Sequence, residues 1–477
     1  MSSKFPKPQS PENAVEQPPT ARPEPWHPIH DIPQNSVVRA IADYIYAQAP
    51  RQNRTFASVA AIALWAGIVG RNVNVMNAGL NLYFLVIAGT GRGKDGMVSG
   101  ITKLVEAIAK TMPNARNLVS GKFASAQAIL QHLKANPGTL SIQGEGEYLF
   151  RRLTSPKASQ NDQELLQTLL ELFSKSGLGQ VFTGYRKADL AASVAQIYSP
   201  TFTLLTEGTF GLIDALLDNE SIRRGLGPRC SVVISEAARP DLNPDAKNAT
   251  PDQKLVEYLA GVVSWASSYS SPLQVVNTTF SEEANEIQTA FDRETTSYIN
   301  NSGNNVEAEL WNRSHLKAVK TAALIAAGFN PYCPQIDATT MQWAIAVERF
   351  NVNQLLSTME SGEVGEVTED VRLSRIIKAC AEYVNQREPW LFPKGYRVDA
   401  ELHDCKIITF AFLNNRVGNT KPFRKDGYKN PSQIIRDCLK VLVDNGDLEL
   451  ISKPKMAQDH KRNVEGWMIA NPRTFGL

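Results

Sequence analysis

The order of apolar and polar residues in the first half of the chain predicts strands that alternate with helices. Continuous apolar runs bounded by glycine or polar residues are typical of buried strands. Such runs occupy residues 82–87, 138–143, 199–206 and 230–235. Between them, apolar residues recur at helical spacing at 56–69, 125–133, 162–174 and 210–217. This alternation indicates an α/β fold with a parallel sheet that is covered by helices.

The second half of the chain has a different pattern. Helical spacing dominates from about 253 to 358, and a polar, glutamate-rich stretch at 361–369 separates it from the C-terminal part. That part is predicted to contain helices at 371–386, 405–414 and 431–445, followed by a hairpin with strands at 448–451 and 466–470. Three helices followed by a hairpin is the plan of a winged-helix domain, a variant of helix-turn-helix.

Composition narrows the class of protein. No run of about 18 apolar residues occurs and the N-terminus is polar and rich in proline, so we expect no membrane span, no membrane partner and no secretory signal. Five scattered cysteines without a C-x-x-C pair, and six dispersed histidines, favour reduced thiols over disulfides or zinc. A net charge of +2 means that nucleic-acid affinity would have to come from local basic surfaces. We therefore expect a cytoplasmic protein.

A glycine-rich motif joins the apolar run at 82–87 to a predicted helix, which is the layout of a phosphate-binding P-loop. Glycines let the backbone curl, so that N–H groups and the helix dipole face a polyphosphate, and a lysine reaches the terminal oxygens. The motif therefore predicts ATP or another nucleoside triphosphate as a ligand. The residues expected to contact it are Gly89, Thr90, Gly91, Arg92, Gly93, Lys94 and Asp95.

The motif departs from the pattern G-x-x-x-x-G-K-[ST] at two positions. Ala88 stands in place of the first glycine, and Asp95 replaces the hydroxyl that ligates Mg²⁺. A carboxylate is a good ligand for a hard cation, so we expect Asp95 to hold Mg²⁺ directly or through water. The alternative is a glycine-rich turn in which Asp95 merely caps the helix.

Acidic residues follow the strand at 138–143, about fifty residues after Lys94. In P-loop ATPases such a strand end positions Mg²⁺ and the attacking water. We therefore expect a catalytic role for Glu145 or Glu147, with Glu145 also as a metal ligand. An ordinary acidic turn is the alternative.

Two further positions are candidates for nucleotide contact. Thr206 and Glu207 end a later strand, where a polar group is expected to contact the γ-phosphate or the attacking water, and Thr206 is the residue selected for this contact. The alternative is a cap for the helix that begins near Phe210. Arg313 precedes a helix at 316–327 and is expected to reach the nucleotide from a helical lid.

Arginines surround a second glycine-rich turn, Gly225 to Gly227, which we expect to expose them. An arginine supplied to a neighbour's γ-phosphate stabilises charge in the transition state. Arg224 and Arg229, with Arg223 beside them, are candidates for this role. The alternatives are a solvated basic turn or a contact to DNA phosphates.

The C-terminal part is rich in basic residues with interleaved aromatic ones. A basic helix beside a basic hairpin tip suits duplex phosphates and a groove. A winged helix that docks onto protein is the alternative. The residues expected to contact DNA are Arg424, Lys425, Lys429, Arg436, Lys440, Lys453 and Lys455.

A chain of 477 residues is too long to fold around a single ordinary hydrophobic core. We divide it into a disordered Pro-rich tail (1–34), an N-terminal helical segment (35–78), a P-loop NTPase core (79–250), a helical lid (251–360), a linker (361–369) and a winged-helix domain (370–477).

The order of these motifs over about residues 35 to 360 resembles a prophage and mobile-element P-loop family known as domain of unknown function 3987. The resemblance is carried by the stretch from Asn81 to Asp95, Glu145, the stretch from Ser199 to Thr209, the turn from Gly225 to Arg229 and the stretch from Trp311 to Ala327. It implies a RecA-like or AAA+-like ATPase of the helicase and primase neighbourhood, active in replication of a phage, plasmid or genomic island, with a primase or other replication proteins as partners.

These observations lead to one expected function and two rivals. The first is a DNA-dependent ATPase with ATP and Mg²⁺ as cofactors, which forms a homo-oligomeric ring such as a hexamer and acts as a replicative helicase or replication initiator. The second is a nucleotide-sensing DNA-binding regulator or loader with little hydrolysis. The third is an assembly scaffold that has lost nucleotide binding.

Overall fold

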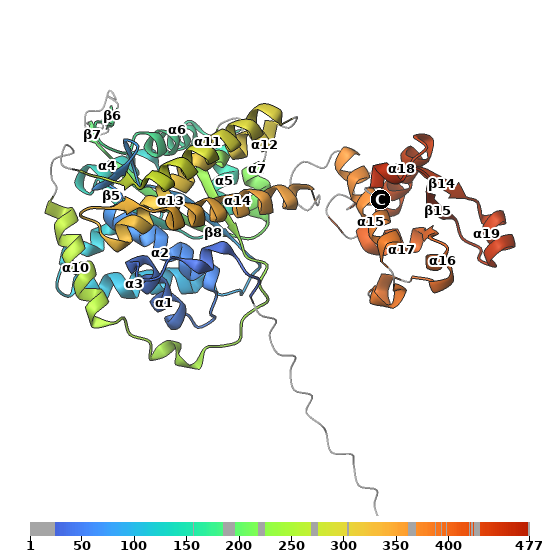
Figure 1. The fold of residues 1–477 in the computed structure, drawn as a ribbon, viewed down its shortest axis with the longest axis horizontal. Coiled ribbons are helices and arrows are strands. Elements are labelled where there is room, and N and C mark those ends of the chain that lie inside the picture. Colours follow the sequence, from blue (N-terminus) through green and yellow to red (C-terminus); the bar gives the residue numbers. More distant parts are fainter. Residues whose placement is uncertain are drawn as a thin grey trace, which may run out of the picture.

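A five-stranded parallel sheet lies at the centre of the N-terminal part in the computed structural model of the chain (Figure 1). The structure describes residues 24–475 except 156, 185–195, 218–224, 269–274, 303–304, 361–368, 387, 393, 397, 419, 421–422 and 424–429. The strand order is β4 (Val119–Ser120), β5 (Gly138–Gln143), β8 (Thr201–Gly208), β3 (Tyr83–Ile87) and β9 (Cys230–Ile234). Every neighbouring pair is parallel, which confirms the predicted α/β fold.

Helices cover both faces of this sheet. Tyr83 Oη donates a hydrogen bond to Leu169 O of α6 (Gln160–Ser174), so Tyr83 and its partner Leu204 face α6. Thr201 lies three residues before Leu204 and points to the opposite face, where its side chain lies against Gly70 at the end of α2 (Arg54–Val69). The helix α3 (Asp95–Ala109) packs on α2 and on α1 (Val37–Gln48). The remaining helices that contact α6 or α5 are α4 (Ala126–Ala135), α5 (Gly146–Thr154), α7 (Gly211–Leu217) and α9 (Leu226–Arg229).

The region expected to be a lid shares one continuous cluster of buried apolar side chains with the sheet. Its helices are α10 (Gln253–Ser268), α11 (Glu282–Asn301), α12 (Asn305–Trp311), α13 (Ser314–Phe329) and α14 (Ala338–Glu360), with α13 and α14 side by side (Figure 1). Lys317 of α13 forms a buried ion pair with Glu348 of α14 at 2.7 Å and donates to Cys230 O at 3.0 Å. These helices therefore pack on the edge strand β9 through α14 and on α2 through α10 and α13, and they are not a separate hydrophobic unit.

Short strands complete the N-terminal part. They are β1 (Val73–Val75), β2 (Ala78–Gly79), β6 (Val181–Phe182), β7 (Ile197–Tyr198), β10 (Val276–Asn277), β11 (Thr279–Phe280) and β12 (Gln335–Ile336). The pairing of β1 with β10 and of β11 with β12 joins segments that are far apart in the sequence.

The predicted tail was wrong for its last residues. A short 3₁₀ helix, Pro28–Asp31, follows the buried His27, and the side chains of Ile29 and Ile32 are buried in the main core. Trp343 of α14 donates to Pro28 O at 2.9 Å. Two isoleucines among the prolines provide enough apolar surface to fix this segment. Residues 1–23 of the expected tail lie outside the described residues.

The C-terminal part has its own hydrophobic core and a three-stranded antiparallel sheet of order β13-β15-β14. Its elements are α15 (Glu369–Asn385), α16 (Ala400–Asp404), β13 (Ile408–Thr409), α17 (Phe410–Val417), α18 (Pro431–Asp444), β14 (Leu448–Ile451), α19 (Lys453–His460) and β15 (Gly466–Ile469). The predicted helix at 405–414 was wrong at its start, because Ile408 and Thr409 pair with Trp467 and Gly466 and the helix begins at Phe410. The expected linker, 361–369, lies outside the described residues up to position 368.

Two general features accompany this fold. None of the five cysteines, all of which lie within the described residues, forms a disulfide. Among the helices of the described residues, none combines the length and apolar character that crossing a membrane would require.

Candidate nucleotide-binding site

A glycine-rich loop, residues 89–94, connects β3 to α3 and is called the glycine loop below. Gly91 and Gly93 have φ angles of +72° and +93°, a backbone region that favours glycine. A Cβ atom at Gly93 would also lie only 2.4 Å from Arg51 O. The glycines therefore allow a tight curl that ends at the first residue of α3, Asp95.

Lys94 lies across the carboxyl ends of two strands. Its ammonium donates to Ala88 O at 3.1 Å and to Gly208 O at 2.8 Å, so it joins the ends of β3 and β8. Burial lowers the pKa of Lys94, and the nearby Glu207 and Asp95 carboxylates oppose that shift. A half-buried cation is thus held at the start of a helix.

A cavity of about 410 Å³ opens at Lys94. It brings the lysine together with both acidic residues expected after β5. The cavity is lined by Lys94, Glu145, Glu147, Tyr148, Arg151, Glu207, Gly208 and Thr209. Two cationic side chains, of Lys94 and Arg151, and three carboxylates therefore meet at the carboxyl edge of the sheet.

The two expected acidic residues differ in their surroundings. Glu145 is exposed and has a φ of +53°, a conformation that is uncommon for a residue other than glycine and that often occurs at functional sites. Glu147 lies in the first turn of α5, where its carboxylate accepts hydrogen bonds from Arg151 Nε at 3.1 Å and Thr209 Oγ1 at 3.2 Å. Glu147 is thus engaged by protein groups, whereas Glu145 faces solvent.

Glu207, which was considered together with Thr206 at the end of β8, contributes the third carboxylate. Its pKa is raised by burial and by Asp95, and lowered by Lys94. Its Oε2 atom is buried and has no hydrogen-bond partner within the described part of the chain. An unpaired buried carboxylate oxygen beside a lysine is costly unless a ligand or cation satisfies it.

Thr206, which was expected at the site, is buried on the opposite face of β8. A Cβ atom at Gly146 would lie 2.5 Å from the Oγ1 atom of Thr206. The Thr206 hydroxyl therefore lies against the start of α5 and not in the cavity. Successive side chains of a strand point to opposite faces. Glu207 therefore lines the cavity, and Thr206 does not.

Asp95 is exposed at the first position of α3. The N-cap residue is Lys94, without a capping hydrogen bond from its side chain, so Asp95 does not act as the cap. In the described ranges there is no group of three or more His, Cys, Asp or Glu side chains that could hold a metal ion.

The loop after β9 contacts and supports the glycine loop. This contact was not predicted from the sequence. Ser235 N donates to Ile87 O at 2.8 Å, and the Arg92 guanidinium donates to Ala237 O. The side chain of Arg239 lies against Gly91. Residues 235–239 therefore form a second wall beside the glycine loop.

Arg229 and Arg313 lie at the amino ends of the central strands, whereas Lys94 lies at their carboxyl ends. Arg229 directly precedes β9, whose first residue pairs with Tyr83 at the start of β3. The charge of Arg313 lowers the pKa of Arg229 in addition to the larger effect of burial, so the two guanidinium groups are near each other. The structure does not bring either arginine to the Lys94 cavity of the same chain.

The expectation that the glycine-rich turn exposes Arg229 was wrong. Its guanidinium is half-buried, donates to Gly225 O at 2.6 Å and lies 5.9 Å from the centre of the Phe173 ring. Positive φ at Gly225 is followed by the short helix α9, which turns the arginine back toward the core. Arg223 and Arg224 lie outside the described residues.

In the C-terminal part, Arg436 and Lys440 lie one turn apart on the exposed face of α18. Arg436 is engaged by Glu465 at 2.9 Å and by the Phe410 ring at 4.2 Å from its centre. Lys453 and Lys455 are exposed in α19, which replaces the expected hairpin tip. The other candidates, Arg424, Lys425 and Lys429, lie outside the described residues.

Comparisons with known proteins do not assign this site. No protein-family model matches the chain, and no curated protein matches it either.

Proposed function

We propose that this chain is a DNA-associated P-loop ATPase, with ATP and Mg²⁺ bound at the Lys94 cavity. One observation carries the proposal: a glycine loop with two positive φ angles presents Lys94 at the start of α3, beside three carboxylates. A helix start with free N–H groups binds phosphate, and the lysine adds positive charge at its terminal oxygens.

Each residue of the Lys94 cavity has a separate role in the proposed ATP hydrolysis. The backbone of the glycine loop and Lys94 bind the β- and γ-phosphates, and Asp95 holds Mg²⁺, which neutralises charge on those phosphates. Glu145, exposed at the rim of the cavity, orients the attacking water and adds a metal ligand. Glu207 positions Lys94 through the charge interaction between the two groups.

The strand order supports a RecA-like or AAA+-like core. β8 lies between the strand that precedes the glycine loop and the strand that leads to Glu145. Polar residues at the ends of three adjacent parallel strands then face one bound nucleotide. Ligands of open α/β sheets bind in this position, at the carboxyl ends of the strands.

The C-terminal part supports the DNA contact. Helices α15, α17 and α18 with the sheet β13-β15-β14 have the element order of a winged-helix domain, in which α18 is the recognition helix. Its apolar face is buried, and its outer face carries Arg436 and Lys440. Arg436 must exchange its ion pair with Glu465 for a phosphate.

The steady-state rate of ATP hydrolysis, measured with and without single- and double-stranded DNA, tests this function. A rate that rises on addition of DNA supports a helicase or replication initiator. Tight ATP binding without turnover favours the second candidate, a nucleotide-sensing regulator or loader. The carboxylate of Asp95 in place of a hydroxyl favours that candidate, because it adds negative charge beside the γ-phosphate. Absence of ATP binding by the folded protein would refute both.

Asp95→Ser is expected to change metal dependence more than nucleotide affinity. The substitution replaces a charged metal ligand with the hydroxyl of the usual pattern, and the exposed side chain makes no cap that would be lost. Titration of Mg²⁺ at fixed ATP should show a clear shift of the midpoint, whereas affinity for ATP without metal should change little. An unchanged Mg²⁺ midpoint would exclude Asp95 as a metal ligand.

Lys440→Glu is expected to weaken DNA binding. Each phosphate contact that is lost should flatten the slope of log affinity against log salt by about 0.9 for duplex DNA. Lys378→Glu is the matched control, because it reverses an exposed lysine on α15 of the same part. Equal losses for the two variants, measured by fluorescence anisotropy over a salt series, would contradict the assignment of α18.

A further inference from the structure

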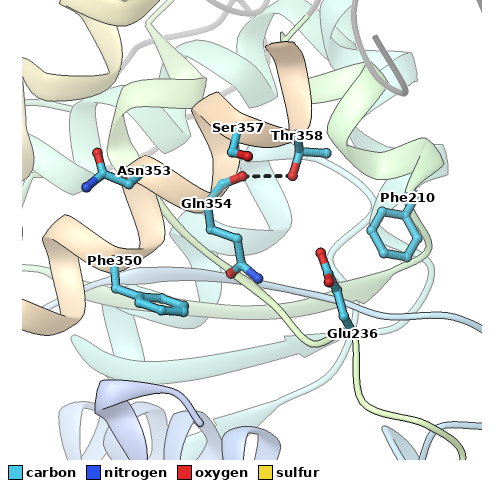
Figure 2. A pocket seen from close by; sticks show the side chains of 7 residues that line it. All are labelled: Phe210, Glu236, Phe350, Asn353, Gln354, Ser357 and Thr358. Carbon is cyan, nitrogen blue, oxygen red and sulfur yellow. Dashed lines mark hydrogen bonds between the residues drawn. The ribbon is translucent and has the colours of Figure 1, made fainter. Parts of the chain in front are cut away.

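A second cavity, of about 620 Å³, lies between α14 and the loops that follow β8 and β9 (Figure 2). Phe210 comes from the first loop and Glu236 from the second, while Phe350 and Gln354 come from α14. Figure 2 shows the Gln354 carboxamide pointing from the helix into the space between Phe350 and Glu236.

This cavity adjoins the glycine loop on two sides. Phe210 is two residues after Gly208, whose carbonyl oxygen accepts a hydrogen bond from Lys94. Glu236 lies between Ser235 and Ala237. The backbone N–H of Ser235 donates a hydrogen bond to Ile87 O, and Ala237 O accepts one from Arg92. The cavity and the glycine loop therefore both lie against the loops that follow β8 and β9.

The chemistry of the cavity suits a nucleoside rather than a phosphate. Two phenyl rings, of Phe210 and Phe350, offer flat apolar surface to an aromatic base. The Oε1 atom of Gln354 is buried and has no hydrogen-bond partner among the described residues. A hydrogen-bond donor on a ligand would satisfy this oxygen. The Glu236 carboxylate also accepts hydrogen bonds and repels phosphate.

We propose that this cavity binds the adenine base and ribose of the nucleotide whose phosphates bind the glycine loop. The inference rests on the proposed ATPase function and deepens it by naming the base. A glutamine carboxamide pairs with adenine through two hydrogen bonds, from N6–H to its oxygen and from its N–H to N7. The Glu236 carboxylate accepts from the ribose hydroxyls, as acidic residues do in dinucleotide sites.

Calorimetric titration of ATP, GTP and inorganic tripolyphosphate, each with Mg²⁺, tests the proposal. The wild-type protein should prefer ATP to GTP, and Gln354→Leu should lower the affinity for ATP by roughly tenfold, because a bidentate pair is lost. Affinity for tripolyphosphate should not change. Gln342→Leu is the matched control, since Gln342 is an exposed glutamine on the same helix that does not line this cavity.

The outcomes separate this inference from the ATPase proposal. If ATP binding needs Lys94 but Gln354→Leu and Glu236→Ala each leave the affinities for ATP and GTP unchanged, the base lies elsewhere and the ATPase proposal stands. If tripolyphosphate and ATP both fail to bind the folded wild-type protein, the ATPase proposal itself fails. Circular dichroism and thermal unfolding show whether each variant is folded.

Discussion

Replacing Lys94 with alanine should weaken ATP binding by about 100-fold, because hydrogen bonds to charged groups contribute about 1.5–3 kcal/mol each and this ammonium reaches the phosphates of the nucleotide. The variant also loses two hydrogen bonds within the protein, to Ala88 O and Gly208 O. We therefore expect the free energy of unfolding to fall by about 1–2 kcal/mol as well. Titration calorimetry and thermal unfolding measure the two effects separately.

Lys110→Ala is the control for this prediction. Lys110 is an exposed lysine at the opposite end of α3, so its removal changes the charge of the same helix without touching the glycine loop. Its affinity for ATP should match that of the wild-type protein. Unchanged affinity in the folded Lys94→Ala protein would mean that the glycine loop is only a tight turn.

Long elements with a clear pattern could be predicted from the sequence. The strand Gly138–Gln143 and the helix Arg54–Val69 were predicted to within about two residues, because an apolar run between glycines and an apolar helix leave few alternatives. The strand that precedes the glycine loop was predicted for the same reason. The parallel direction of the strands then followed from the alternation of strands and helices, whereas their order in the sheet was not predicted.

Short elements carry too little pattern to be predicted. Two-residue strands such as Val119–Ser120 contain no periodicity, and their pairing depends on residues that are far away in the sequence. The helix α19 was missed because Pro454, at its first turn, is equally typical of a hairpin turn. The buried segment at Pro28 depends on α14, more than three hundred residues later.

At the site, the sequence identified the loop but could not choose between neighbouring residues. Whether Thr206 or Glu207 faces the cavity depends on the register of β8 with β3, which only the paired sheet defines. The bracing by Arg92 and the loop after β9 depends on a contact across 145 residues. Burial of Arg229 depends on Phe173, which comes from another helix.

The position of Arg229 leads to a prediction about how subunits share the catalytic site. At about 3.3 Å per residue, β3 alone separates Tyr83, near Arg229, from Ile87, near Lys94, by roughly 13 Å. Arg229 therefore cannot act at the Lys94 cavity of its own chain and can act only at the cavity of a neighbouring subunit. If it does, Arg229→Ala should lower the rate of hydrolysis by about a thousandfold and leave ATP affinity nearly unchanged, because an arginine finger stabilises charge that develops in the transition state.

Mixing two inactive variants tests whether the site is shared. An assembly of Arg229→Ala and Lys94→Ala subunits places an intact arginine beside an intact glycine loop at some interfaces, so part of the ATPase activity should return, whereas each variant alone stays inactive. Arg313→Ala and Arg224→Ala, mixed in the same way, show which arginine is responsible. Thermal unfolding must accompany the assay, because Arg229 also contacts Gly225 O and the Phe173 ring within the fold. No recovery in oligomers shown to contain both variants would assign this arginine cluster to the stability of the fold or to DNA contact instead of catalysis.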